Sequence, residues 1–326
     1  MKVALDVFGG DNAPAAAIKG ALKAKEEFGI ESILCGNKEK IKEAAKENNI
    51  DITGFEIADA ENVIEIEDDP TEIIKSKNNC SMAVALKAVA ENKAAAAVSA
   101  GSTGALVIGG TFIVKRIKGI KRCSLAAIIP SLKNHFLLLD VGANAEVKPE
   151  FLMQFGVMGS VYAEKVMGIK NPKVKMLNIG EEDCKGTEVH KEAYKLLKQA
   201  NINFLGNAEG RDIMSGNQDV LISDGFSGNI ALKTIEGVSG SLFSMLKGVF
   251  YKNTVTKLAA LTLKGGLREI KHKTDYTAVG GAPLLGTKAP VFKAHGSSNE
   301  IAFKNAIYNA YIFAKNGVIK EIEENL

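Results

Sequence analysis

Cysteine is scarce in this sequence, and its residues lie far apart along the chain. The four positions are Cys35, Cys80, Cys123 and Cys184. Neither the close pairs of a zinc site nor the framework of a disulfide-rich secreted domain is present. We therefore expect reduced thiols and a cytoplasmic location.

Net charge and long apolar runs are also lacking. Lys and Arg number 41 and Asp and Glu 38, an excess too small to indicate nucleic-acid binding. The N-terminus, MKVALDVFGGD, reaches Asp and Gly too early for the apolar core of a signal peptide. No apolar run approaches the roughly 20 residues that cross a bilayer. Any membrane contact is therefore expected to be peripheral.

The usual signatures of cofactors and metals are missing as well. The sequence contains no G-x-G pair and no G-K-[ST], which the dinucleotide fingerprint and the P-loop require. It has no H-E-x-x-H, no Cys or His cluster and no EF-hand loop. A G-x-S-x-G elbow is also missing. We expect no metal site, no cofactor and no serine nucleophile of the hydrolase type.

Short runs rich in Val, Ile and Leu recur along the 326 residues, and segments of helical period alternate with them. This alternation predicts an α/β protein with a mostly parallel sheet covered on both faces. The longest polar break, PSLKNH, divides a first lobe (1–130 and 287–326) from a second (131–286). The strand candidates are KVALDV, ESILCG, AAAAVSAG, AAIIP, FLLLDVGAN, VKMLNIG, NFLGN and DVLISDG.

Polar loops follow five of the predicted strands, at the ends where open α/β sheets bind ligands. In the loop after AAAAVSAG, two glycines permit close backbone approach, and Ser and Thr supply hydroxyls in front of a helix N-terminus that attracts anions. Two interpretations fit: a phosphate site, or a turn whose Ser and Thr cap the helix. The number of such loops favours binding. They occupy residues 8–12, 99–104, 140–144, 206–211 and 224–229.

Among the four histidines, His295 has the position best suited to acid–base chemistry. It follows the apolar PVFKA and precedes GSSNE and a helical segment. This order places the imidazole at a strand end beside a helix N-terminus. A partly exposed turn also fits, and we favour the site residue.

Residues 241–273 combine positive charge with apolar side chains. Seven Lys or Arg lie between Lys247 and Lys273, against the single acid Glu269. A basic amphipathic helix pair of this kind is typical of contact with anionic lipid or an acidic partner. A helical hairpin packed in a dimer interface fits equally well.

Ten motifs stand in a fixed order along nearly the whole chain. They are GGDNAP (9–14), KNNCSMAVALKAV (77–89), SAGSTGA (99–105), RIKGIKR (116–122), LDVGAN (139–144), NIGEE (178–182), GNAEGRDI (206–213), SDGFSGNIALKT (223–234), GGAPLLG (280–286) and HGSSNEIAFKNAI (295–307). In this order the sequence resembles the PlsX family of phosphate acyltransferases.

The resemblance implies a two-lobed α/β/α sandwich, similar to isocitrate and isopropylmalate dehydrogenases and to phosphotransacetylases. It implies reversible transfer of a fatty acyl group from acyl carrier protein to inorganic phosphate. The acyl phosphate then serves an integral-membrane glycerol-3-phosphate acyltransferase in phospholipid synthesis. The family resemblance also implies a homodimer that associates peripherally with the membrane surface.

The implied reaction gives each loop an expected role. His295 is expected to protonate the departing thiolate or to stabilise its charge, and Asp224 to orient the group. Asn144 and Asn229 are expected to donate hydrogen bonds to the carbonyl oxygen or to phosphate. Phosphate itself is expected to contact Gly101, Ser102, Thr103, Gly104, Ser227, Gly228 and Ser297.

Acyl carrier protein is acidic, so a basic surface is expected for it. The candidates for docking are Lys115, Arg116, Lys118, Lys121, Arg122 and Lys185, with residues 247–273 as a competing surface. Membrane contact is expected from Phe250, Lys257, Leu258, Leu261 and Lys264.

Two other classes of function compete. A metal-dependent dehydrogenase of the same broad fold would need a carboxylate cluster and a nucleotide loop, and the sequence has neither. A membrane-bound scaffold built on the basic helices would leave the five polar loops without a purpose.

Overall fold

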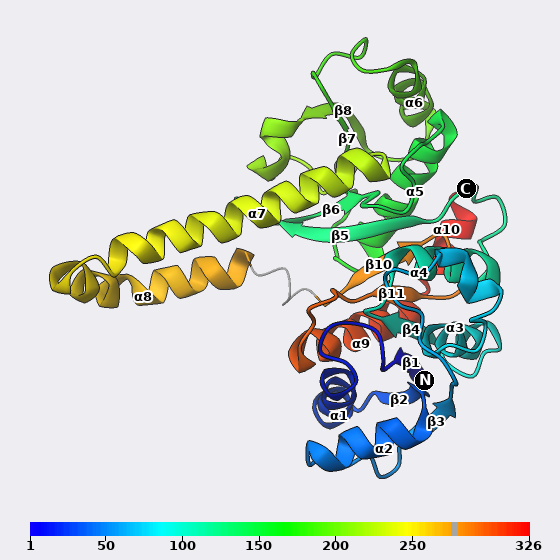
Figure 1. Cartoon of the computed structure of the whole chain (residues 1–326). Coiled ribbons are helices and arrows are strands. Elements are labelled where there is room, and N and C mark those ends of the chain that lie inside the picture. Colours follow the sequence, from blue (N-terminus) through cyan, green and yellow to red (C-terminus); the bar gives the residue numbers. More distant parts are fainter. Residues whose placement is uncertain (275–279) are drawn as a thin grey trace.

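The computed structural model describes residues 1–274 and 280–326, apart from the side chains of residues 264 and 267–274 (Figure 1). The strands of this part of the chain form one 11-stranded sheet in the order β3-β2-β1-β4-β11-β10-β5-β6-β9-β7-β8. Their bounds are β1 (Lys2–Asp6), β2 (Glu31–Gly36), β3 (Glu56–Asp59), β4 (Ala96–Ser99), β5 (Ser124–Pro130), β6 (His135–Leu139), β7 (Val174–Asn178), β8 (Phe204–Glu209), β9 (Val220–Ile222), β10 (Ala282–Leu285) and β11 (Val291–Lys293).

The sheet is mostly parallel, with an antiparallel centre. Strands β3, β2, β1, β4 and β11 run in one direction, and β6, β9, β7 and β8 run in the other. Between them, β10 and β5 are antiparallel to each other and to their outer neighbours. Lys293 at the end of β11 lies opposite Ala282, and Leu139 at the end of β6 lies opposite Ala126. The carboxyl ends of the two parallel groups therefore approach the same central strands from opposite directions.

Helices cover both faces of the sheet, because the buried strands present apolar side chains on both sides. Along β1, Val3 and Leu5 enter one apolar core and Ala4 enters the other. The first core lies under α1, α2, α5, α6, α9 and α10, and the second under α3, α4 and the start of α7. The helix bounds are α1 (Ala15–Phe28), α2 (Lys38–Glu47), α3 (Ser81–Ala90), α4 (Thr103–Gly109), α5 (Pro149–Lys165), α6 (Glu188–Gln199), α7 (Gly225–Phe250), α8 (Thr254–Thr274), α9 (Glu300–Lys315) and α10 (Val318–Glu324).

The α/β class and the mostly parallel sheet are confirmed, and all eight strand candidates form strands. The eight strand candidates do not include β3, β10 or β11, although β11 lies in the apolar run PVFKA that predicts a strand before His295. The helical periods of the sequence do not indicate α5 or α10. The division into lobes at residues 130 and 286 stays a prediction. In the described chain, β10 joins β11 to β5 and makes the sheet continuous across it.

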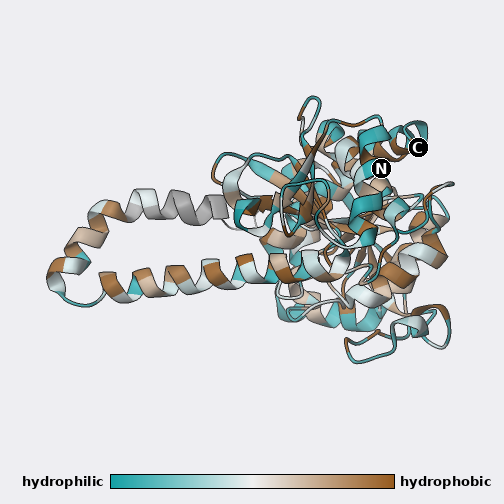
Figure 2. Ribbon diagram, turned by 90° about the horizontal axis from the view of Figure 1, so that it is seen from above, coloured by the Kyte–Doolittle hydropathy of each residue, from teal (hydrophilic) through white to brown (hydrophobic). Residues whose placement is uncertain are grey.

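Helices α7 and α8 form a hairpin that projects from the body (Figures 1 and 2). Apolar side chains on it are exposed, among them Val238, Leu242, Met245, Val249, Val255, Leu258 and Leu261. Lys257 lies 6.0 Å from the ring of Tyr251, between the two helices. None of the helices in the described part of the chain has the length and apolar character that crossing a bilayer needs.

Candidate active site

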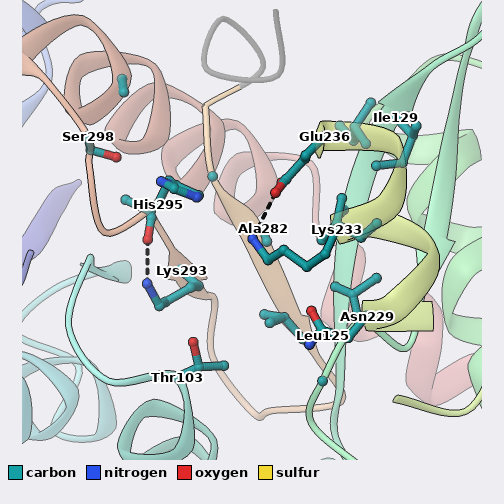
Figure 3. Close-up of a pocket in the computed structure, with 18 residues that line it drawn as sticks. Thr103, Leu125, Ile129, Asn229, Lys233, Glu236, Ala282, Lys293, His295 and Ser298 are labelled. Carbon is teal, nitrogen blue, oxygen red and sulfur yellow. Dashed lines mark hydrogen bonds and ion pairs between the residues drawn. The ribbon is translucent and has the colours of Figure 1, made fainter. Parts of the chain in front are cut away.

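A cavity of about 370 Å³ lies over the central strands β5 and β10 (Figure 3). One side is formed by the start of α4 and by the end of β11 with the loop after it, and the facing side by the first turns of α7 (Figure 3). Its polar lining consists of Thr103, Asn229, Lys233, Glu236, Lys293, His295 and Ser298. Its apolar lining includes Leu125, Ala127, Ile128, Ile129, Val141, Leu232 and Ala282.

The loops after β1, β4 and β11 meet on the first side of the cavity. Gly9 packs so closely that a Cβ there would stand 2.5 Å from the backbone nitrogen of Gly101, which explains the need for glycine. Beneath this contact, buried Asp6 accepts a 2.7 Å hydrogen bond from Ser99 Oγ. Burial raises the pKa of Asp6, while hydrogen bonds from Ser81 and Ser99 oppose the shift.

In loop 99–104, one hydroxyl caps a helix and another faces the cavity. Ser102 is buried, and its Oγ caps α4 by accepting a hydrogen bond from Ala105 N at 3.4 Å. Thr103 lines the cavity. Gly104 packs against Pro70, where a Cβ would stand 2.8 Å from that ring. The capping interpretation therefore holds for Ser102, and Thr103 is the hydroxyl that the cavity presents.

The His295 loop is fixed by the N-terminal loop and by its own backbone. Asn12 Nδ2 donates to the carbonyls of Ser297 and Ser298 at 3.2 Å each. Ser297 N donates to His295 Nδ1 at 3.2 Å, so Nδ1 is an acceptor and the neutral ring carries its proton on Nε2. Burial, followed by the charge of Lys233, lowers the pKa of His295 below 6.5. Near neutral pH His295 is therefore an uncharged N–H donor.

Lys293, the last residue of β11, adds a cation to the same side of the cavity as His295. Its Nζ donates to the carbonyls of Ala100 at 3.1 Å and Ala294 at 2.6 Å. Burial lowers the pKa of Lys293 to about 8, although Asp6 opposes the shift. Ser298 adds a side chain that is only 3% exposed, and its Oγ has no hydrogen-bond partner among the described residues.

The loop after β6 is organised around the buried carboxylate of Asp140. Asp140 accepts hydrogen bonds from the backbone N–H groups of Leu125 at 2.9 Å, Ala143 at 3.2 Å and Asn144 at 2.7 Å. Burial raises the pKa of Asp140 to about 6, against the effect of these donors. The Nδ2 of Asn144 donates to Cys123 O at 2.7 Å and to Asp140 at 2.8 Å. Both N–H donors of this side chain are therefore used within the fold.

Helix α7 starts against the Asp140 loop and presents three polar side chains to the cavity. Asp224 caps the helix, because its Oδ1 accepts from Ser227 N at 2.7 Å. A Cβ at Gly228 would stand 2.0 Å from the carbonyl oxygen of Asp140, so only glycine permits this approach. Ser227 is exposed. Asn229, Lys233 and Glu236 follow at helical spacing along the cavity side, and Lys233 pairs with Glu236 at 2.8 Å.

The structure brings together residues from four of the five expected loops and leaves one outside. Residues 206–209 form the end of β8 rather than a loop, and Gly210 and Arg211 begin a 3-10 turn in which Arg211 pairs with Glu209 at 2.7 Å. Lys185 is exposed in the loop after β7 and does not line the cavity. Lys115, Lys118, Lys121 and Arg122 are exposed and Arg116 is half-buried, on the segment that leads into β5.

The expected membrane residues lie on the hairpin, away from the cavity lining. Leu258 and Leu261 are exposed, Phe250 is half-buried and Lys257 is exposed. Lys264 belongs to α8, and its side chain lies outside the described residues. Across the described chain, no group of three or more His, Cys, Asp or Glu side chains is arranged to hold a metal ion.

Four cavity residues are missing from the sequence-based prediction. Lys233 and Glu236 stand four and seven positions after Asn229, a spacing that puts all three on one helical face. Lys293 interrupts the apolar run PVFKA with a charge, which is a detectable anomaly. Nothing in the sequence separates buried Ser298 from exposed Ser297.

Comparisons with known proteins agree along the full chain. The family model described as "Fatty acid synthesis protein" matches residues 1–321. The phosphate acyltransferases of Alkaliphilus oremlandii and Lysinibacillus sphaericus are each 48% identical, over 100% of this chain and 97% and 98% of theirs. A solved phosphotransacetylase from Streptococcus pyogenes shares the fold with a TM-score of 0.65 at 18% identity, covering 97% of this chain and 94% of its own. The chain therefore belongs to the fatty acid synthesis protein family and is a homologue of phosphate acyltransferases.

Proposed function

We propose that this protein transfers a fatty acyl group from acyl carrier protein to inorganic phosphate, reversibly, and so supplies acyl phosphate for glycerol-3-phosphate acylation in phospholipid synthesis. The observation that carries the proposal is the two-part lining of one cavity. Its polar lining includes Lys233 and Lys293 against the single acid Glu236, which suits an anion. Its other lining is apolar, which suits an alkyl chain. The relatives' name, phosphate acyltransferase, joins the same two substrates.

The reaction needs positioning and charge stabilisation more than a strong base, because phosphate dianion is abundant near neutral pH. Thr103, Lys293 and Ser298 hold the phosphate at the polar end. His295 Nε2 and Asn229 donate to the carbonyl oxygen of the thioester as negative charge develops there. The lowered pKa of His295 favours this stabilising role over proton donation.

Asn144 and Asp224 act on the geometry of the site rather than on the substrate. Asn144 ties Asp140 to the start of β5 through Cys123 O. Asp224 fixes the first turn of α7, and with it the direction of Asn229. Ser102, Gly101, Gly104 and Gly228 shape the same loops by capping or by close approach.

The acyl donor is a carrier protein, and its docking surface is the basic segment 115–122. This segment leads directly into β5, which lines the cavity from Leu125 onward. The backbone of this segment is held by Gln154, which donates to Gly119 O at 3.0 Å and accepts from Lys121 N at 2.9 Å. Lys185 is a weaker candidate, because it follows Glu181, Glu182 and Asp183 in the sequence and an acidic partner would be repelled there.

The hairpin of α7 and α8 gives the protein a membrane-facing or self-associating surface. We place the protein in the cytoplasm, as a homodimer that touches the membrane surface peripherally and delivers acyl phosphate to an integral-membrane acyltransferase. The exposed apolar residues of the hairpin support both contacts. The two-lobe division and the relation to the isocitrate and isopropylmalate dehydrogenases belong to the same proposal.

The test is phosphate-dependent release of free thiol from palmitoyl-carrier protein, measured beside palmitoyl-coenzyme A. We expect release that requires phosphate, with acyl phosphate trapped by hydroxylamine. Faster release from the carrier protein would establish the docking preference. No phosphate-dependent release from either donor would overturn the proposed function.

A further inference from the structure

Resting on this proposed function, we propose that Lys293 is the catalytic acid: its ammonium protonates the departing thiolate and then regains a proton from the phosphate that has attacked. No sequence motif points to this residue. Lys293 is a half-buried cation at the end of β11, and it lines the cavity together with Thr103 and His295 (Figure 3).

The ammonium of Lys293 is held and aimed by its neighbours. An ammonium has three donors, and the carbonyls of Ala100 and Ala294 accept from Lys293 Nζ. These contacts fix the flexible side chain from two directions and leave one donor for a substrate. Figure 3 shows Nζ between Thr103 and the His295 loop, on the side of Lys293 away from Asn229.

Ser298 supplies a second observation that points to a ligand at this place. Its Oγ is buried and has no partner in the described structure, yet the residue lines the cavity. An unsatisfied buried hydroxyl is costly, and a phosphate oxygen would satisfy it. The hydroxyl and the ammonium of Lys293 both reach this cavity from the chain segment around the end of β11, so a phosphate bound there would lie against its acid.

Charged groups on β1, on the loop after it and on α7 change the pKa of Lys293. Asp6 on β1 and Asp11 in the following loop favour the ammonium, whereas Lys233 on α7 and burial disfavour it. Glu236 neutralises part of the charge of Lys233 at 2.8 Å, and His295 is uncharged near neutral pH. The resulting pKa of Lys293, about 8, is close to the ordinary value of about 8.5 for a cysteine thiol. A general acid works best when its pKa matches the task in this way.

The step balances without an added co-reactant. An oxygen of hydrogen phosphate attacks the thioester carbon, a C–O bond forms and the C–S bond breaks. The sulfur takes the bonding pair and a proton from Lys293, which gives a thiol and a neutral amine. The acyl phosphate still carries the phosphate proton, and it transfers that proton to the amine. The net reaction moves one proton from phosphate to thiol and restores Lys293.

The decisive experiment varies the leaving group. A poor leaving group, as in palmitoyl-pantetheine, needs an acid, whereas the acidic aryl thiol of palmitoyl-thionitrobenzoate departs without one. For Lys293→Met we expect thiol release from the first donor to fall by roughly 100-fold or more, and release from the second to fall far less. Lys233→Met, which removes another cation of the same cavity, is the matched control and is expected to slow both donors by the same factor.

A pH profile adds a readout that a merely structural role would not change. In the wild-type protein, turnover of palmitoyl-pantetheine should decline above about pH 8, as Lys293 loses its proton. In Lys293→Arg the side chain stays charged, so this decline should vanish while the rate remains low, because arginine does not release its proton. This conservative variant also serves if Lys293→Met fails to fold, as judged by thermal unfolding.

The outcomes separate the two proposals. Phosphate-dependent release by the wild-type protein, with equal losses on both donors in Lys293→Met, would show that Lys293 binds or supports rather than donates a proton, and would overturn this inference alone. Absence of phosphate-dependent release by the wild-type protein would overturn the proposed function itself. An unchanged basic limb in Lys293→Arg would also count against Lys293.

Discussion

Helix α7 contains two regions with opposite chemistry on one continuous helix. Residues 225–236 face the cavity and present Asn229, Lys233 and Glu236. Residues 238–249 project from the body and expose Val238, Leu242, Met245 and Val249 (Figure 2). Both sets repeat at intervals of three or four residues, so the same helical period lines the cavity at one end and forms an apolar surface at the other.

The two parts of α7 also differ in how they are held by the rest of the fold. The first part of α7 is fixed to the fold by Asp224 and by the contact of Gly228 with Asp140. The distal part contacts little except α8, and its apolar side chains remain exposed in the monomer. Substitutions in the first part should therefore change turnover, and substitutions in the second should change where the protein binds.

The largest effect is expected from Asn229→Ala in the cavity part. If its amide donates to the thioester oxygen, removing it should lower turnover by about 100-fold, as loss of one oxyanion donor does elsewhere. The measurement is kcat for phosphate-dependent thiol release. Ser244→Ala, on the exposed distal part of the same helix, is the matched control and should leave kcat unchanged. A loss of under a few-fold in Asn229→Ala would remove this residue from the mechanism.

The next effect is expected from the hairpin. Changing Leu258 and Leu261 together to Glu removes two exposed apolar side chains, each of which contributes about 1.5–3 kcal/mol when buried. Binding to vesicles that contain anionic lipid should therefore fall by at least about 10-fold in sedimentation, while kcat on palmitoyl-pantetheine stays within about twofold.

The same double variant separates the two occupants of the hairpin surface. Sedimentation equilibrium without lipid reports the dimer, and vesicle binding reports the membrane. Loss of the dimer with unchanged vesicle binding would assign these leucines to an interface between copies of the chain. Loss of kcat would contradict the separation of the two parts of α7.

The sequence predicted most strands of the sheet but not β3 or β10. Alternating apolar runs correctly indicated strands such as β1 and β6, because a strand buried on both faces is apolar throughout. Strand β10 has the sequence APLL between glycine-containing segments, and a four-residue run gives too short a signal. Helix α5 packs closely against β6 and β9 through Gly156 and Gly159. Apolar residues occur on all faces of this helix, so its sequence shows no amphipathic stripe.

The sequence predicted only some of the residues that line the cavity. Loop motifs revealed Thr103, Asn229 and His295, all of which line the cavity. Lys293 is marked in the sequence only as a charge within an apolar run, and the pairing of β11 with β4 and β10 decides where it faces. Ser298 is distinguished from its neighbours only by its burial. Pairing between distant strands is a tertiary property that no local motif contains.

A smaller effect is expected at the apolar wall of the cavity. Ala127 lines it from β5, so Ala127→Phe should shorten the space for the acyl chain. We expect kcat/KM for palmitoyl donors to fall by roughly 10-fold while that for butyryl donors changes by less than about twofold, because overfilling acts only on chains that reach the side chain. The ratio of the two donors is the measurement. Equal losses for both would place the acyl chain elsewhere.

The smallest effect is expected on KM for the carrier protein. A change in KM alone would separate binding of the carrier from turnover. If segment 115–122 docks an acidic partner, Lys118→Glu should raise KM for palmitoyl-carrier protein a few-fold at low salt and leave KM for palmitoyl-pantetheine unchanged. Lys185→Glu and the distant exposed Lys46→Glu test the alternatives. Salt should reduce the difference between Lys118→Glu and the wild type, because it screens exposed charges.

Two other outcomes would contradict this docking surface. A rise in KM in Lys185→Glu instead would place the docking surface in the loop after β7. A KM that changes with none of these charges and not with salt would mean that the carrier is recognised through its pantetheine arm alone.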